Sequence, residues 1–161
     1  MSHFHIAFTA PVNTVQASPR LTRDDVWQGC VLLAQAPETF TSAIASCQTV
    51  LKEGERTVRT LRFRNNALPD IKQEVILVDK FKFECTTLAT GNKVTTVIFH
   101  GISGDLDDLF LSLEYSIPYG GTDPDSTEGD KFRAQYTEKA KENLMEGLET
   151  MRKLKIDGKL Y

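Results

Sequence analysis

Few residues in this chain have side chains that could take part in chemistry. Its histidines are His3, His5 and His100. His100 precedes a glycine at the end of a predicted strand, where it could act as a general base near neutral pH or simply close the strand. His3 and His5 lie opposite Phe4 and Ile6 on a predicted strand and are expected to face solvent. The sequence contains no nucleotide-binding, zinc-protease or serine-hydrolase motif, so we predict neither a cofactor nor a metal.

The three cysteines, Cys30, Cys47 and Cys85, all lie in apolar stretches of the sequence. Their number is odd, no pair has the spacing of a zinc site, and no Cys-x-x-Cys occurs. We interpret them as reduced thiols that pack as small apolar groups, which is typical of a cytoplasmic protein.

Alternation along the predicted strands indicates which polar groups face the interior. Arg59 shares a strand face with Leu61 and Phe63, so burial of Leu61 would turn the guanidinium inward. A buried cation is costly unless it meets an acid or an anionic ligand. The alternatives are therefore a salt bridge at a cavity rim, a bulge that turns Arg59 outward, or a ligand carboxylate or enolate. In the last predicted strand, Tyr115 is the one polar tip on a leucine-rich face.

The predicted ligand-binding residues combine these two polar groups with three further aromatic side chains. Alternation along its strand predicts that Phe83 also faces the interior. Trp27 of the first predicted helix and Tyr136 of the last helix complete the set. The five candidates are Arg59, Phe83, Tyr115, Tyr136 and Trp27. We assign no catalytic residue.

Seven segments with strand periodicity must position these residues. The first is Phe4–Phe8. Thr22 is expected to cap a first helix, and Pro37 suits the first residue of a second short helix that extends to about Ala43. The six further strands are predicted over Cys47–Lys52, Glu55–Arg64, Ile71–Val78, Phe81–Leu88, Val94–His100 and Leu109–Ile117.

A long amphipathic helix follows the strands. It is expected to begin near Asp123 or Thr127 and to span roughly 25 residues, or about 37 Å. Its apolar side chains recur every three or four residues from Phe132 to Met151. Gly147 interrupts the stripe at a cost of about 1 kcal/mol of helix propensity. Close approach to the sheet or room for a ligand could explain this glycine, and so could a simple packing gap.

Composition limits the classes of function. The 161 residues suit a single domain, 1–161, and 40% of them are hydrophobic, which is enough for a core. A formal net charge of −3 argues against nucleic acid as the main partner, because phosphate binding needs clustered cations. The N-terminal segment is too short and polar for a signal peptide or a membrane span.

The order of one strand, two short helices, six strands and a long C-terminal helix resembles the helix-grip superfamily (SRPBCC). This group includes START domains, the birch pollen allergen family and aromatic polyketide cyclases. The stretches Val94–Phe99 and Leu109–Tyr115, with the Gly-Asp-Leu loop between them, are most similar to the AtaL-like branch. The resemblance implies an α+β fold in which a seven-stranded, curved antiparallel sheet surrounds the long helix. Such relatives are expected to carry an acid directly after the aromatic of the last strand. Ser116 stands there instead, so no acid–base role is transferred.

The resemblance also implies an apolar cavity between sheet and helix and a role in secondary metabolism. We therefore expect an apolar or aromatic small molecule as the partner, bound by a carrier or by a cofactor-independent cyclase or isomerase. An interaction module, such as a chaperone-associated protein, is the alternative. A cavity bordered by two or more ionisable groups would favour the enzyme, and a purely apolar cavity the carrier. A filled cavity would favour the interaction module. The oligomeric state is not predicted.

Overall fold

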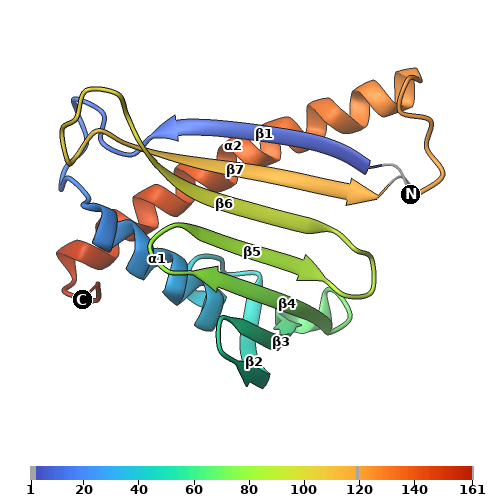
Figure 1. Cartoon of the computed structure of the whole chain (residues 1–161). Coiled ribbons are helices and arrows are strands. Elements are labelled where there is room, and N and C mark those ends of the chain that lie inside the picture. Colours follow the sequence, from blue (N-terminus) through green and yellow to red (C-terminus); the bar gives the residue numbers. More distant parts are fainter. Residues whose placement is uncertain (1–2, 119, 161) are drawn as a thin grey trace.

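The structure is a computed structural model that describes residues 3–118 and 120–160, so that Met1 and Ser2 of the N-terminal segment lie outside the described residues. Its elements follow the predicted order (Figure 1). They are β1 (His3–Pro11), α1 (Arg23–Gln35), η1 (Pro37–Thr39), β2 (Ile44–Glu53), β3 (Arg56–Phe63), η2 (Arg64–Asn66), β4 (Ile71–Val78), β5 (Lys82–Thr87), β6 (Lys93–His100), β7 (Leu109–Pro118) and α2 (Thr127–Ile156).

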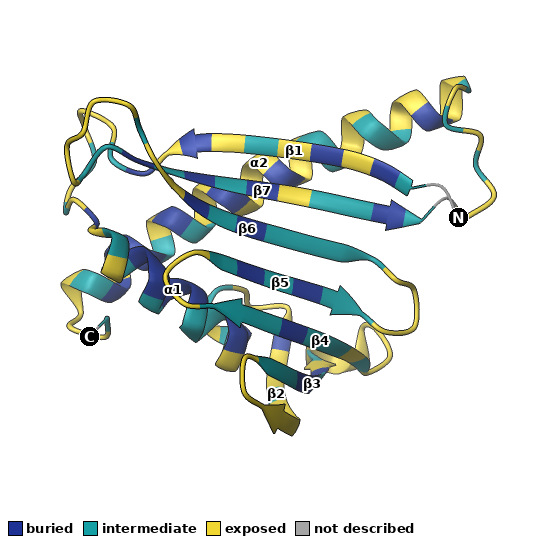
Figure 2. Ribbon diagram, in the orientation of Figure 1, coloured by how far each residue is buried: buried dark blue, intermediate teal, exposed yellow. Residues whose placement is uncertain are grey.

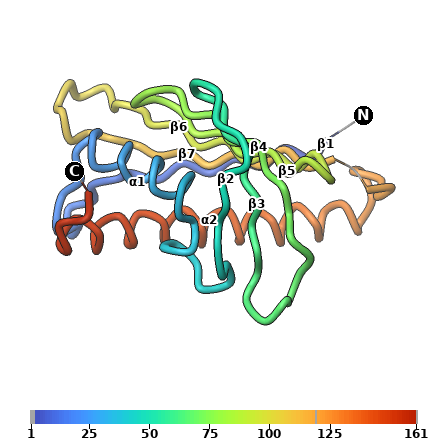
Figure 3. Tube along the Cα trace, turned by 90° about the horizontal axis from the view of Figure 1, so that it is seen from below, coloured from blue at the N-terminus to red at the C-terminus, as the bar shows by residue number. Residues whose placement is uncertain are grey.

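The strands form one seven-stranded sheet in the order β1-β7-β6-β5-β4-β3-β2, and every neighbouring pair is antiparallel. Figure 3 shows both helices on the same side of this sheet, with β2 and β3 curling down toward the level of α2. Helix α2 contacts β1, β7 and α1, while α1 contacts β5 and β6. The predicted fold class is confirmed: this is the helix-grip arrangement.

Local signals place the helix ends. Thr22 caps α1, because its side chain accepts a hydrogen bond from the backbone of Asp25 while the Asp25 carboxylate accepts from the Thr22 backbone. The second helix is shorter than predicted and consists of one 3₁₀ turn, Pro37–Thr39. The chain leaves helical geometry early because Ile44 already pairs with Phe63 in the sheet.

The long helix is 30 residues, five more than the sequence predicted, and Ser126 caps its start by accepting a hydrogen bond from the backbone of Gly129 at 3.1 Å. Figure 2 shows buried and exposed residues alternating along it. Its first half is only partly buried, and Phe132 there stacks on Phe4 of β1 with ring centroids 4.6 Å apart. None of the helices in the described part of the chain is long and apolar enough to cross a membrane.

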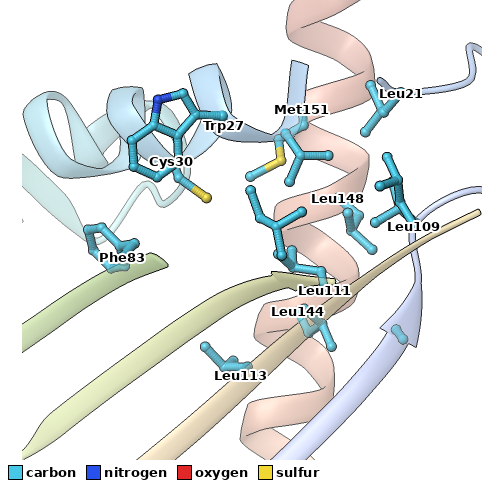
Figure 4. Packing of buried hydrophobic residues seen from close by; sticks show 14 of the residues in the cluster. Leu21, Trp27, Cys30, Phe83, Leu109, Leu111, Leu113, Leu144, Leu148 and Met151 are labelled. Atoms are coloured by element: carbon cyan, nitrogen blue, oxygen red, sulfur yellow. The ribbon is translucent and has the colours of Figure 1, made fainter. Parts of the chain in front are cut away.

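The core lies between the sheet and the two helices. The inward face of β7 was predicted correctly, since Leu109, Leu111, Leu113 and Ile117 are all buried. In Figure 4 these leucines point toward α2, while Trp27 and Cys30 approach from α1. The parity of β3 was also correct. Leu61 is buried beside Arg59, and Arg62 faces solvent.

Candidate functional site

A cavity of about 310 Å³ lies between the sheet, α1 and the second half of α2. Its wall is mostly apolar, and Figure 4 shows Cys30, Phe83, Leu113 and Met151 reaching toward a shared interior from different elements. The lining residues are Cys30, Leu33, Phe40, Thr41, Phe83, Val94, Thr96, Leu111, Leu113, Tyr115, Asn143, Leu144, Glu146, Gly147 and Met151. The size falls at the lower end of the range for small-molecule sites, roughly 300–1,000 Å³.

Tyr115 is the main polar group that the sheet contributes to this cavity. Asn143 of α2 donates a hydrogen bond from Nδ2 to the Tyr115 hydroxyl oxygen at 2.7 Å. Burial raises the pKa of the phenol above its ordinary value, and the bond from Asn143 opposes this only in part. The phenol therefore stays neutral near pH 7 and keeps its proton. The partner of this hydroxyl in the structure is Asn143.

Gly147 opens the helix side of the cavity. A Cβ atom added at this position would meet no atom within 4 Å, so close approach to the sheet does not explain the glycine. The open space is part of the cavity, since Gly147 belongs to its lining. Glu146, next to it, is the charged residue of the lining and is exposed at the mouth.

Arg59 faces inward, but the cavity lining does not include it. Its side chain is 4% exposed and donates to the carbonyl oxygens of Leu33 at 2.8 Å and Ala34 at 2.7 Å, in the last turn of α1. It also donates twice to Gln73 Oε1, at 3.1 and 2.8 Å. Among the described residues it forms no salt bridge, so the salt bridge considered from the sequence is replaced by the negative end of a helix dipole.

The remaining predicted site residues divide between the wall and its surroundings. Phe83 borders the cavity and is 4% exposed. Trp27 is buried in the core behind the wall. Tyr136 also stays outside the lining. Its ring meets that of Tyr115 edge-on at 6.1 Å, so it supports Tyr115 from behind.

The sequence did not identify Asn143 or Glu146 as site residues, because helix periodicity places Glu146 on the polar face of the last helix and does not mark the residues at the border of the apolar stripe. Asn143, Gly147 and Met151 are spaced by four residues and share one helix face. A polar residue and a glycine on the face that also carries Met151 were the available signal. Burial raises the pKa of the Cys30 thiol to about 12, so this wall residue is a neutral, apolar group. Within the described ranges, no cluster of three or more His, Cys, Asp or Glu residues is arranged to hold a metal.

Comparisons with known proteins agree with this architecture. The family model described as acetylaranotin biosynthesis cluster protein L, AtaL, matches residues 6–158. The curated protein of that name from Aspergillus terreus is 23% identical over 163 residues, covering 98% of this chain and 93% of the relative.

Two solved structures are similar in fold. The Zhui aromatase/cyclase from Streptomyces sp. R1128 superposes with a TM-score of 0.61 at 13% identity, over 93% of this chain and 92% of that one. The structure of Ara h 8.0201 gives a TM-score of 0.58 at 11% identity, over 92% and 96% of the two chains.

Proposed function

The chain belongs to the AtaL family, whose model spans almost its whole length, and we propose that it holds a small apolar or aromatic molecule of a biosynthetic pathway in the cavity between its sheet and α2. The observation that carries this proposal is the cavity itself, which combines a mostly apolar wall with a few polar groups, as small-molecule sites do. The name of the Aspergillus relative, a biosynthesis cluster protein, supports a role in such a pathway.

A specific feature favours chemistry beyond storage. Two ionisable side chains border the cavity, Tyr115 from β7 and Glu146 from α2. A cofactor-independent cyclase or isomerase needs little more than a fixed ligand conformation and one acid or base, since positioning supplies most of the rate. We therefore place the cyclase or isomerase ahead of the pure carrier. The interaction module ranks below both. A filled cavity would have favoured it, and the side chains of the described residues leave the cavity open.

Binding of the neutral fluorescent probe N-phenyl-1-naphthylamine tests the proposal. The probe should bind with one-to-one stoichiometry and a rise in fluorescence. Gly147→Trp should abolish this binding, because nothing within 4 Å of the added Cβ keeps a large side chain from entering the cavity.

Met145→Trp is the matched control, since Met145 is an exposed residue of α2 that does not border the cavity. Binding that is absent from the unmodified protein, or that survives unchanged in Gly147→Trp, contradicts the proposal. Mass spectrometry of an organic extract of the purified protein would separately identify any metabolite that occupies the cavity.

A further inference from the structure

We propose that Tyr115, held by Asn143, donates a hydrogen bond to a neutral carbonyl oxygen of the ligand, so that the cavity selects aromatic ketones over hydrocarbons and over carboxylates. This inference rests on the proposed function, because it names the class of ligand for the same cavity. Three features of the cavity carry it: the direction of one hydrogen bond, the character of the wall around it, and the charge at the mouth.

The direction of the Tyr115–Asn143 hydrogen bond leaves the phenol proton available. A tyrosine hydroxyl has one proton to donate, and its oxygen accepts. Asn143 Nδ2 is a donor, so this bond occupies the oxygen and not the proton. Within residues 3–118 and 120–160, no hydrogen-bond acceptor for the Tyr115 proton is found. The bond also fixes the position of the hydroxyl, because it links β7 to α2 beside the cavity.

The surroundings of the hydroxyl favour a ligand with a flat apolar body. Tyr115 is half-buried and shares the lining with Phe83, Leu111 and Met151, which together offer an aromatic ring, a branched chain and a flexible thioether. A hydrogen bond made where water is partly excluded is stronger than one made in bulk water. A ligand whose apolar ring system packs against this wall would place its carbonyl oxygen near the Tyr115 hydroxyl.

The charge at the cavity mouth indicates that this oxygen is neutral. Glu146 is the charged residue of the lining, and its carboxylate would repel a ligand carboxylate or phosphate. Arg59, a cation that could have bound an anion from the interior, has its donors directed to the end of α1 and to Gln73. A neutral ketone or similar carbonyl accepts a hydrogen bond from the phenol. It is not repelled by Glu146, and it needs no cation such as Arg59.

The test compares three ligands with the same ring system. These are 2-acetylnaphthalene, 2-ethylnaphthalene and 2-naphthoate, each measured by displacement of N-phenyl-1-naphthylamine. Tyr115→Phe should weaken binding of the ketone about fivefold, the effect of one ordinary hydrogen bond, and leave 2-ethylnaphthalene unchanged. 2-Naphthoate should bind more weakly than the ketone, and Glu146→Gln should reduce that difference.

Asn143→Leu is the second variant, on an exposed position of α2 where folding is not at risk. It should also weaken the ketone selectively, because the hydroxyl is no longer held in place. If both variants affect the ketone and the hydrocarbon equally, or if naphthoate binds the unmodified protein best, the inference is wrong while the proposed function stands. If none of the four aromatic compounds binds, the proposed function itself fails.

Discussion

Replacing Arg59 by methionine should lower the free energy of unfolding by about 3–5 kcal/mol, because the substitution removes the donors that close the end of α1. Methionine has a similar length and fills the same space with an apolar chain. The guanidinium donates to the carbonyl oxygens of Leu33 and Ala34 and twice to Gln73 Oε1, and the residue is 4% exposed. Its removal leaves these three acceptor oxygens short of donors in a region that water reaches poorly.

The magnitude follows from those acceptors. Each buried acceptor that loses its partner costs about 1–3 kcal/mol, and two of the three belong to the last turn of α1. Loss of a positive charge at a helix C-terminus adds roughly 0.3–1 kcal/mol. Three of the four hydrogen bonds are only part-buried, so each acceptor lies near the low end of that range. The resulting total of about 3–5 kcal/mol is a large part of the roughly 5–15 kcal/mol by which ordinary domains are stable.

Urea denaturation of Arg59→Met and of a matched control, Arg62→Met, measures the effect. Arg62 lies on the same strand with an exposed side chain and meets Asp70 at 3.3 Å, a surface pair worth about 0–1 kcal/mol. Amide exchange in the last turn of α1 should also accelerate in Arg59→Met alone. If the two variants are equally stable, Arg59 does not hold the end of α1. A loss of probe binding without a loss of stability would instead support the ligand role that the sequence left open for Arg59.

Two further predictions concern α2 and the outer face of the sheet. Gly147→Ala should raise the free energy of unfolding by up to about 1 kcal/mol and weaken binding of N-phenyl-1-naphthylamine, because alanine favours the helix while its methyl group enters the cavity. Gly129→Ala, whose Cβ would lie 2.6 Å from a backbone oxygen, should destabilise instead, so equal effects in urea titrations would contradict this explanation. Burial raises the pKa of Glu84, but hydrogen bonds from Lys82 and Lys93 outweigh it and leave the pKa lowered. The stabilisation from this carboxylate is therefore present above its unfolded pKa of about 4.3 and is lost as the pH falls through the lower folded value. Glu84→Gln should lose less stability than the unmodified protein between pH 6 and pH 3; parallel pH profiles would refute this.

Much of the fold could be predicted because alternation and helix periodicity report which side of each element is buried. The leucines of β7 and the inward turn of Arg59 followed from a period of two alone. The extent of the second short helix could not be predicted this way. Its end depends on the pairing of Ile44 with Phe63, a contact between residues far apart in the sequence that no local propensity encodes.

The candidate site was predictable only in part for the same reason. Phe83 and Tyr115 could be placed on the cavity wall, because a strand's parity fixes the direction of its side chains. Asn143 meets Tyr115 across 28 positions of sequence, and that meeting depends on how α2 is rotated on the sheet. Helix periodicity gives the apolar face but not the polar residues at its border, so Asn143 and Glu146 were not identified.

Arg59 and Tyr115 together show why inward direction alone does not identify a binding group. Both lie on strand faces that point to the interior, and both were candidates from the sequence. The donors of Arg59 are directed to the protein's own acceptors, in α1 and at Gln73. Tyr115 accepts from Asn143 and keeps its proton. The difference lies in hydrogen-bonding capacity left over after folding, since a polar group that the fold has satisfied stabilises the protein, while one with a donor to spare can recognise a ligand.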